Sequence, residues 1–226
     1  MTTTTLNRMA PSAAPDGPAE APSAATSGDV KLRRRTIDRV LIGFGVVATL
    51  AFFVAGGLLT WGATFSSDYV HDELAAQNVT FPTAEELKAE GRGDLVGYAG
   101  EDVTTGAKAE AYAGYIGGHL DEIAGGQTYS QIDDRGARTA VEEAQASGAS
   151  ESEIAELQAT ADQLTGQRDS LFKGETLRGL LLSAYAWSTV GVIAGYAAIG
   201  AFAAAALMAG LVIAGFVHVA RQHRTT

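Results

Sequence analysis

Two long uncharged runs constrain this chain more than any other feature of its sequence. Residues 40–67 contain no Asp, Glu, Lys or Arg for 28 positions, and residues 179–217 contain none for 39 positions. A helix needs about 20 consecutive apolar residues to cross the hydrocarbon core of a bilayer. Both runs exceed that length, so the sequence predicts an all-α membrane protein with two transmembrane helices.

Positive charges before the first run predict its direction through the membrane. Five basic residues lie within nine positions there: Lys31, Arg33, Arg34, Arg35 and Arg39. Segments rich in Lys and Arg stay on the cytoplasmic side of a membrane. We therefore expect residues 1–36 to form a disordered cytoplasmic tail with a basic flank, because the first 30 have few large apolar side chains. Residues 37–62 are then the first transmembrane helix, leading outward.

The second run allows one span or two. As a single helix its 39 residues would be about 58 Å long, against a hydrocarbon core of about 30 Å. The run contains no Pro, Asn or Asp to make a turn. Arg221 and Arg224 follow it and favour the cytoplasm, which requires an even number of crossings. We expect one long helix, with two short spans as the open alternative.

This long helix divides into three expected parts. Residues 177–189 form a helical extension outside the membrane, residues 190–218 span it, and residues 219–226 form a short cytoplasmic tail. Gly191 and Gly195 make a Gly-x-x-x-Gly pattern, which predicts close contact with the first helix or with a second copy. Six residues at helical spacing are expected to pack on the external domain: Leu177, Leu180, Leu181, Ala184, Tyr185 and Ser188.

The segment between the spans, residues 63–176, is acidic and reads as helical. It holds 22 Asp and Glu against 7 Lys and Arg, a net charge of −15 that would repel nucleic acid. Thr83 and Glu86 have the spacing of a capping box at a helix start, and Ser150 begins a similar pattern. Further helices are expected in residues 105–124 and 129–146. The helix after Ser150 has two readings: it breaks near Gly166 or Gly174, or it continues into the second span. We expect a helical extracytoplasmic domain between the transmembrane helices.

Four residues of this segment are candidates for a metal site. His71 and His119 have carboxylates beside them, including Asp121 and Glu122, and these are ligand types of zinc and iron. Adjacent residues on a helix point about 100° apart, and no His-x-x-x-His or His-Glu-x-x-His spacing is present. The pattern favours surface histidines over a metal site.

Motifs for other chemistry are missing from the sequence. The chain has no cysteine, no Gly-x-Ser-x-Gly turn and no phosphate-binding glycine loop. The two uncharged runs carry no acid or base at mid-depth, which a transport pathway usually needs. We predict no catalytic residue and no cofactor.

Several stretches resemble an uncharacterised family of actinobacterial membrane proteins. They are residues 60–65 (TWGATF), 69–74 (YVHDEL), 81–82 (FP), 128–131 (TYSQ) and 171–182 (LFKGETLRGLLL). The resemblance covers about residues 60–220 and implies a two-span protein of unknown activity. Some members of that family carry a label of aromatic ring-opening dioxygenase. That reaction needs iron held by histidines and a carboxylate, and the resemblance transfers no catalytic residue to this chain.

The sequence therefore predicts a non-enzymatic, multi-pass protein of the cell membrane with both termini in the cytoplasm. Besides the lipid bilayer, its expected contacts are a protein partner bound by the acidic domain, within a membrane or envelope complex, or a second copy of the chain. The alternative is a metal-dependent enzyme or metal-sensing domain that uses the external histidines and carboxylates. A ligand sensor is the third class, although residues 1–36 contain no recognisable output module.

Overall fold

The computed structural model describes residues 34–222, and this part of the chain is helical without any strand. The all-α prediction is therefore confirmed. A single bridge between Thr80 and Asp102 is the one β-type pairing among these residues. The elements in chain order are α1 (Arg34–Ala75), α2 (Ala84–Ala89), the 3₁₀ helix η1 (Gly93–Tyr98), α3 (Gly106–Ala124), α4 (Asp134–Ser147) and α5 (Glu151–Gln222).

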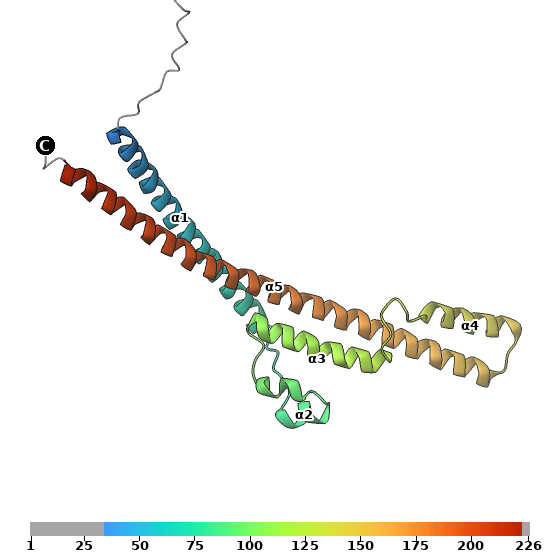
Figure 1. Cartoon of the computed structure of the whole chain (residues 1–226). Coiled ribbons are helices and arrows are strands. Elements are labelled where there is room, and N and C mark those ends of the chain that lie inside the picture. The colour runs from blue at the N-terminus through green and yellow to red at the C-terminus, as the bar shows by residue number, and fades with distance from the viewer. Residues whose placement is uncertain (1–33, 223–226) are drawn as a thin grey trace, which may run out of the picture.

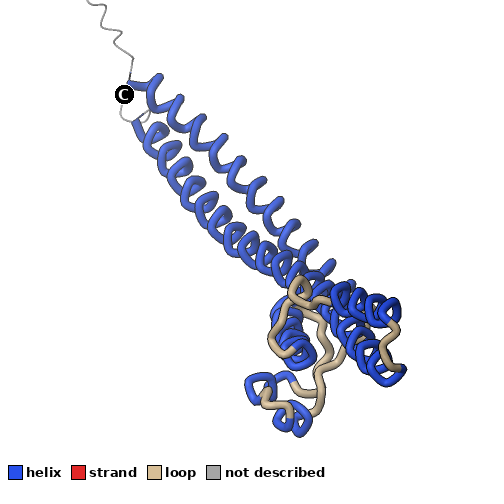
Figure 2. Tube along the Cα trace, turned by 90° about the vertical axis from the view of Figure 1, so that its right-hand side faces the viewer, coloured by secondary structure: helices blue, strands red, loops and turns tan. Residues whose placement is uncertain are grey.

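Helix α5 is the spine of the molecule, and three other helices lie along it (Figure 1). Its C-terminal part runs beside α1, its middle part beside α3, and its N-terminal part beside α4. The short elements α2 and η1 stand to one side of α3. Figure 2 shows that α1 begins and α5 finishes at the same end of the long helix pair.

Small residues bring α1 and α5 together. A Cβ placed on Gly191 would lie 3.0 Å from the Ser66 Cβ, and one on Gly195 would lie 3.8 Å from the Ala63 Cβ. The buried Ser66 hydroxyl donates a hydrogen bond of 2.6 Å to the carbonyl oxygen of Trp187. The two glycines therefore face the protein's own first helix, which is one of the two contacts that their spacing predicts.

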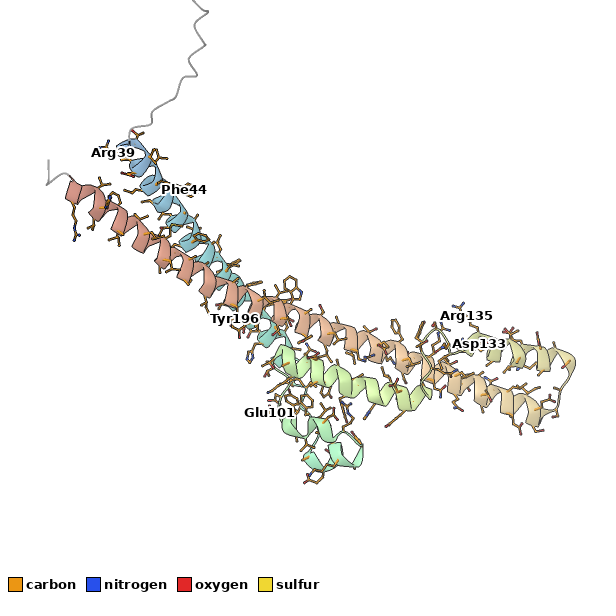
Figure 3. The ribbon with its side chains drawn as sticks, in the orientation of Figure 1. Arg39, Phe44, Glu101, Asp133, Arg135 and Tyr196 are labelled. Carbon is orange, nitrogen blue, oxygen red and sulfur yellow. The ribbon has the colours of Figure 1, made fainter. Side chains whose placement is uncertain are left out.

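The outward faces of this helix pair are apolar and exposed. Two candidate spans fall within residues Thr36–Ala75 and Glu151–Arg221, and only 11% of the most apolar window of each is buried inside the molecule. Phe44 and Tyr196, for example, are 71% and 73% exposed and lie on the pair (Figure 3). Water is a poor solvent for so much contiguous apolar surface. By length and composition, both helices could cross a membrane.

Helix α5 continues without interruption for 72 residues, and the whole 179–217 run lies inside it. Two short spans would need a turn within residues 179–217, and the structure has none there. The expected domain limits at 62/63, 176/177 and 189/190 also fall within α1 or α5, since a helix can leave a membrane without breaking. Gly166 and Gly174 do not break the helix either: Gly174 is buried because it makes room for Leu120 of α3.

Two arginines fasten α3 to its neighbours across a glycine-rich face. Arg178 of α5 donates from Nε to the carbonyl oxygen of Ala113 at 3.2 Å, and its guanidinium lies where a side chain on Gly117 would be. Arg92, just before η1, donates from Nη1 to the carbonyl oxygen of Gly114 at 2.9 Å. The bonds tie α2 and η1 to α3, and α3 to the spine.

Two expectations about packing need correction. Leu177 and Leu180 are 53% and 64% exposed, so they are not part of the buried stripe; Leu181 and Ala184 do pack on the core of the unit. Helix α4 begins at residue 134 rather than near 129, because Asp133 caps it by accepting a hydrogen bond from the Gly136 amide. The capping box at Thr83 and Glu86 is confirmed.

Candidate functional site

The residues predicted as metal ligands lie apart. The Nδ1 atom of His71, on α1, is 3.2 Å from the carbonyl oxygen of Thr104, next to the start of α3. His119 lies near the other end of α3, where its Nε2 is 4.0 Å from a carboxylate oxygen of Glu90 and its ring is tilted against that of Tyr115, with centroids 4.6 Å apart. His119 lies fifteen positions after Thr104 along mostly helical chain, a rise of about 22 Å.

The neighbouring carboxylates do not complete a site. Asp121 and Glu122 are exposed at the C-terminal end of α3. Within residues 34–222, no three His, Asp or Glu side chains are grouped so that they could hold a metal ion. The described part of the chain therefore offers no assembled metal centre.

A groove lies where the end of α1, the middle of α3 and the middle of α5 meet. Its volume is about 450 Å³. The floor is formed by buried core residues, among them Val70, Leu74 and Val103. Leu177 and Leu180 form an exposed wall on α5, which explains why these two leucines are not buried in the protein itself.

Polar groups are few in this groove. Tyr69 and Glu73 lie one turn apart on α1, so they are on one side of it, and Gln77 follows in the turn after that helix. Glu73 is the one charged side chain among the described residues that line the groove. The Tyr112 phenol also lines the groove, and burial raises its pKa further above its usual value.

Exposed aromatic side chains mark the end of the groove nearest the long helix pair. On α1, the rings of Trp61 and Phe65 stack with centroids 5.7 Å apart, and Phe65 stacks on Tyr69 at 6.0 Å. Trp187 is brought to the same level by the hydrogen bond from Ser66 to its carbonyl oxygen. Such rings concentrate where a helix leaves the hydrocarbon core. We call Trp61, Phe65, Tyr69 and Trp187 the aromatic band.

Charged residues are distributed unevenly about this band. Arg39 and Arg221 are exposed at the end of the long pair where α1 begins, and Figure 3 shows Arg39 there. Glu101 and Asp133 lie on the opposite part of the molecule. Arg34 and Arg35 open α1, whereas Lys31, Arg33 and Arg224 lie outside the described residues.

A second polar cluster holds α4 against the spine. Asp134 is 8% exposed and accepts a hydrogen bond from Arg168, whose guanidinium also lies 4.5 Å from the centre of the Tyr129 ring. Burial alone would raise the pKa of Asp134, but Arg168 and Arg138 together hold that pKa below its usual value. These contacts link α4 and the segment before it to α5.

Fold and groove together define a class: an all-helical protein with two helices of membrane-spanning length and composition, and a helical unit beyond one end of the pair. A scan of protein-family models, and searches of curated proteins and of solved structures, found no match to the chain. Sequence reasoning missed the groove because its walls come from three helices. The available signal was the pair of leucines, Leu177 and Leu180, in a segment beside charged residues.

Proposed function

We propose that this chain is a non-enzymatic, two-span protein of the cell membrane that presents an acidic helical unit to a protein partner on the outer side. In this proposal the basic end of the long helix pair, with both termini, lies in the cytoplasm, and the aromatic band lies at the outer interface. The positive charges at one end and the acidic surface at the other support that orientation.

The continuity of α5 is the observation that carries the proposal. The same helix forms part of the apolar pair and then runs from residue 189 to residue 151 through the helical unit. Those 39 residues extend about 58 Å, with α3 and α4 fastened along them. We call residues 151–189 of α5, with α3, α4 and the end of α1 packed along them, the arm. A stiff arm of this kind holds its far end, the tip, at a fixed distance from the bilayer, as suits a docking or spacing element.

The far end of the arm has the charge that a basic partner would meet. Residues 139–167 contain six Asp and Glu and no Lys or Arg. They form the paired ends of α4 and α5, which Figure 1 shows at the tip of the arm. Electrostatic attraction at such a surface raises association rates and selects partners of opposite sign.

Membership of the two-span family that the sequence resembles is part of the same proposal, without an activity. The metal-dependent alternative is not proposed, because His71 and His119 lie on different parts of the arm with separate partners.

Cross-linking in cells tests the docking role. A photoreactive residue at the exposed Ala146, at the tip, should give a discrete cross-linked product that weakens at high salt. A variant that neutralises four exposed tip acids (Glu142→Gln, Glu143→Gln, Glu156→Gln, Asp162→Asn) should lose it. A matched variant elsewhere on the arm (Asp68→Asn, Asp72→Asn, Asp121→Asn, Glu122→Gln) should keep it. Equal cross-linking in both variants, or no discrete product, would contradict the docking role.

A further inference from the structure

We propose that the groove between α1, α3 and α5 binds one acyl chain of a phospholipid whose headgroup carries a primary ammonium group. The inference rests on the membrane placement proposed above and adds a ligand to the arm. It concerns the base of the arm and is independent of whatever partner binds the tip.

The position of the groove points to the bilayer as the source of its ligand. Tyr69 and Trp187 belong to both the aromatic band and the groove lining. A lipid at the interface therefore needs no passage through water to reach the opening. The exposed leucines of the groove wall continue the apolar outer surface of α5 beyond the band.

The two helices differ in where their uncharged runs stop, and the difference leaves an apolar surface uncovered. On α1 the run stops at Asp68. Because Ser66 lies opposite Gly191 and the two helices run in opposite directions, Asp68 is level with residue 189 of α5. The run on α5 continues ten residues further, to residue 179. Leu180 and Trp187 in that stretch are 64% and 58% exposed. An acyl chain lying in the groove would remove this surface from water.

The size and lining of the groove suit an acyl chain rather than a polar metabolite. A volume of about 450 Å³ is within the ~300–1,000 Å³ typical of small-molecule sites. The groove is about 15 Å long, measured as the rise of α5 from Leu177 to Trp187. Its deep surface is apolar, and its floor residues Val70 and Val103 are 4% and 1% exposed.

Charge at the edge of the groove selects the headgroup. Glu73 lines the groove, and Asp68 and Asp72 lie on the adjacent exposed face of α1 beside the aromatic band. These carboxylates would repel a headgroup with net negative charge and attract an ammonium group. A zwitterionic lipid satisfies both conditions. A primary ammonium can in addition donate hydrogen bonds to these carboxylates, which the quaternary ammonium of phosphatidylcholine cannot do.

Tryptophan quenching tests the proposal on the full-length protein. The chain has two tryptophans, so Trp61→Phe leaves Trp187, in the groove lining, as the sole reporter. The variant would be placed in phosphatidylcholine nanodiscs that contain about 5% of a brominated-chain lipid. We expect brominated phosphatidylethanolamine to quench Trp187 at least twofold more than brominated phosphatidylcholine, and brominated phosphatidylglycerol to quench it less than either.

Matched variants separate the groove from the bulk bilayer. Ser183→Phe, an exposed groove position, should remove the excess quenching by filling the site, whereas Ala186→Phe, exposed on the same helix outside the lining, should retain it. Glu73→Gln should make phosphatidylethanolamine and phosphatidylcholine equal, and Asp121→Asn, which changes an exposed carboxylate outside the groove lining, should not. Each intensity is normalised to the same variant in nanodiscs without bromine.

Two outcomes would overturn the proposal. Quenching that follows bromine content alone, with no effect of headgroup or of Ser183→Phe, would show that the groove holds no lipid. A Ser183→Phe variant that changes the number of copies per nanodisc and leaves quenching unchanged would assign the groove to a second copy. Lipid reaches both faces of a nanodisc, so neither outcome depends on the orientation of the arm in cells or on its partner.

Discussion

At the scale of single residues, Gly191 is where the absence of a side chain matters for the contact between α1 and α5. A Cβ there would lie 3.0 Å from the Ser66 Cβ and 3.4 Å from the carbonyl oxygen of Ala63. Gly191→Leu should therefore separate the helices, break the bond from Ser66 to Trp187 and lower stability by about 1–3 kcal/mol. Thermal unfolding in detergent would measure the change. Gly200→Leu, which faces open space on the same helix, is the control; equal loss in both variants would contradict the contact.

Asp134 is the residue whose ionisation should control the attachment of α4. Its pKa is lowered in the folded protein, so its contribution to stability is present above the unfolded pKa of about 3.9 and is lost as pH falls through the folded pKa. The distribution of distances between spin labels at Ala146→Cys and Gln158→Cys should thus stay unchanged down to about pH 4 and broaden below that pH. Asp134→Asn should broaden it already at neutral pH. The exposed acid Glu142, changed to Gln, should behave as the unmodified chain does.

At the scale of elements, α3 and α5 fit together through one glycine at each end of their contact: Gly106 of α3 faces Ser188, and Gly174 of α5 faces Leu120. A Cβ on Gly106 would overlap the Ser188 side chain, so Gly106→Ala should cost about 1–3 kcal/mol of unfolding free energy. Ser188→Gly should recover part of that loss, giving a coupling energy above about 0.5 kcal/mol in a double-mutant cycle. In contrast, Gly179→Ala faces open space and should stabilise α5 by about 0.5–1 kcal/mol. A double-mutant cycle with no coupling energy would contradict the contact between Gly106 and Ser188.

The elements also show which parts of the fold could be predicted from sequence and why. Local signals worked where the cause is local: the Thr83 capping box and the end of α3 at Gly125, which adopts φ 60°. They failed at Leu177 and Leu180, because helical spacing identifies a shared stripe and not which element covers it. The groove needed tertiary structure, since its α1 and α5 walls are about a hundred residues apart in sequence.

At the scale of the whole molecule, α5 joins two environments with one continuous helix. Glycines that are unfavourable in an isolated helix are retained at 174 and 191 because the neighbours α3 and α1 occupy the space. Tertiary packing thus makes the 72-residue helix compatible with its sequence. In the function that we propose, the basic and acidic ends of the molecule lie on opposite sides of a membrane.

Cysteine labelling in intact cells tests that arrangement, and the chain is suited to it because it has no native cysteine. A membrane-impermeant maleimide should label Ala146→Cys at the tip in intact cells, because we place the arm outside. Ser27→Cys and Thr226→Cys should be labelled only after lysis, because we propose that the basic flanks keep both ends of the chain inside. Labelling of Thr226→Cys in intact cells, with Ser27→Cys still protected, would mean that the 179–217 run crosses an even number of times. Labelling of both tails with protection of the tip would reverse the orientation and place the acidic arm in the cytoplasm.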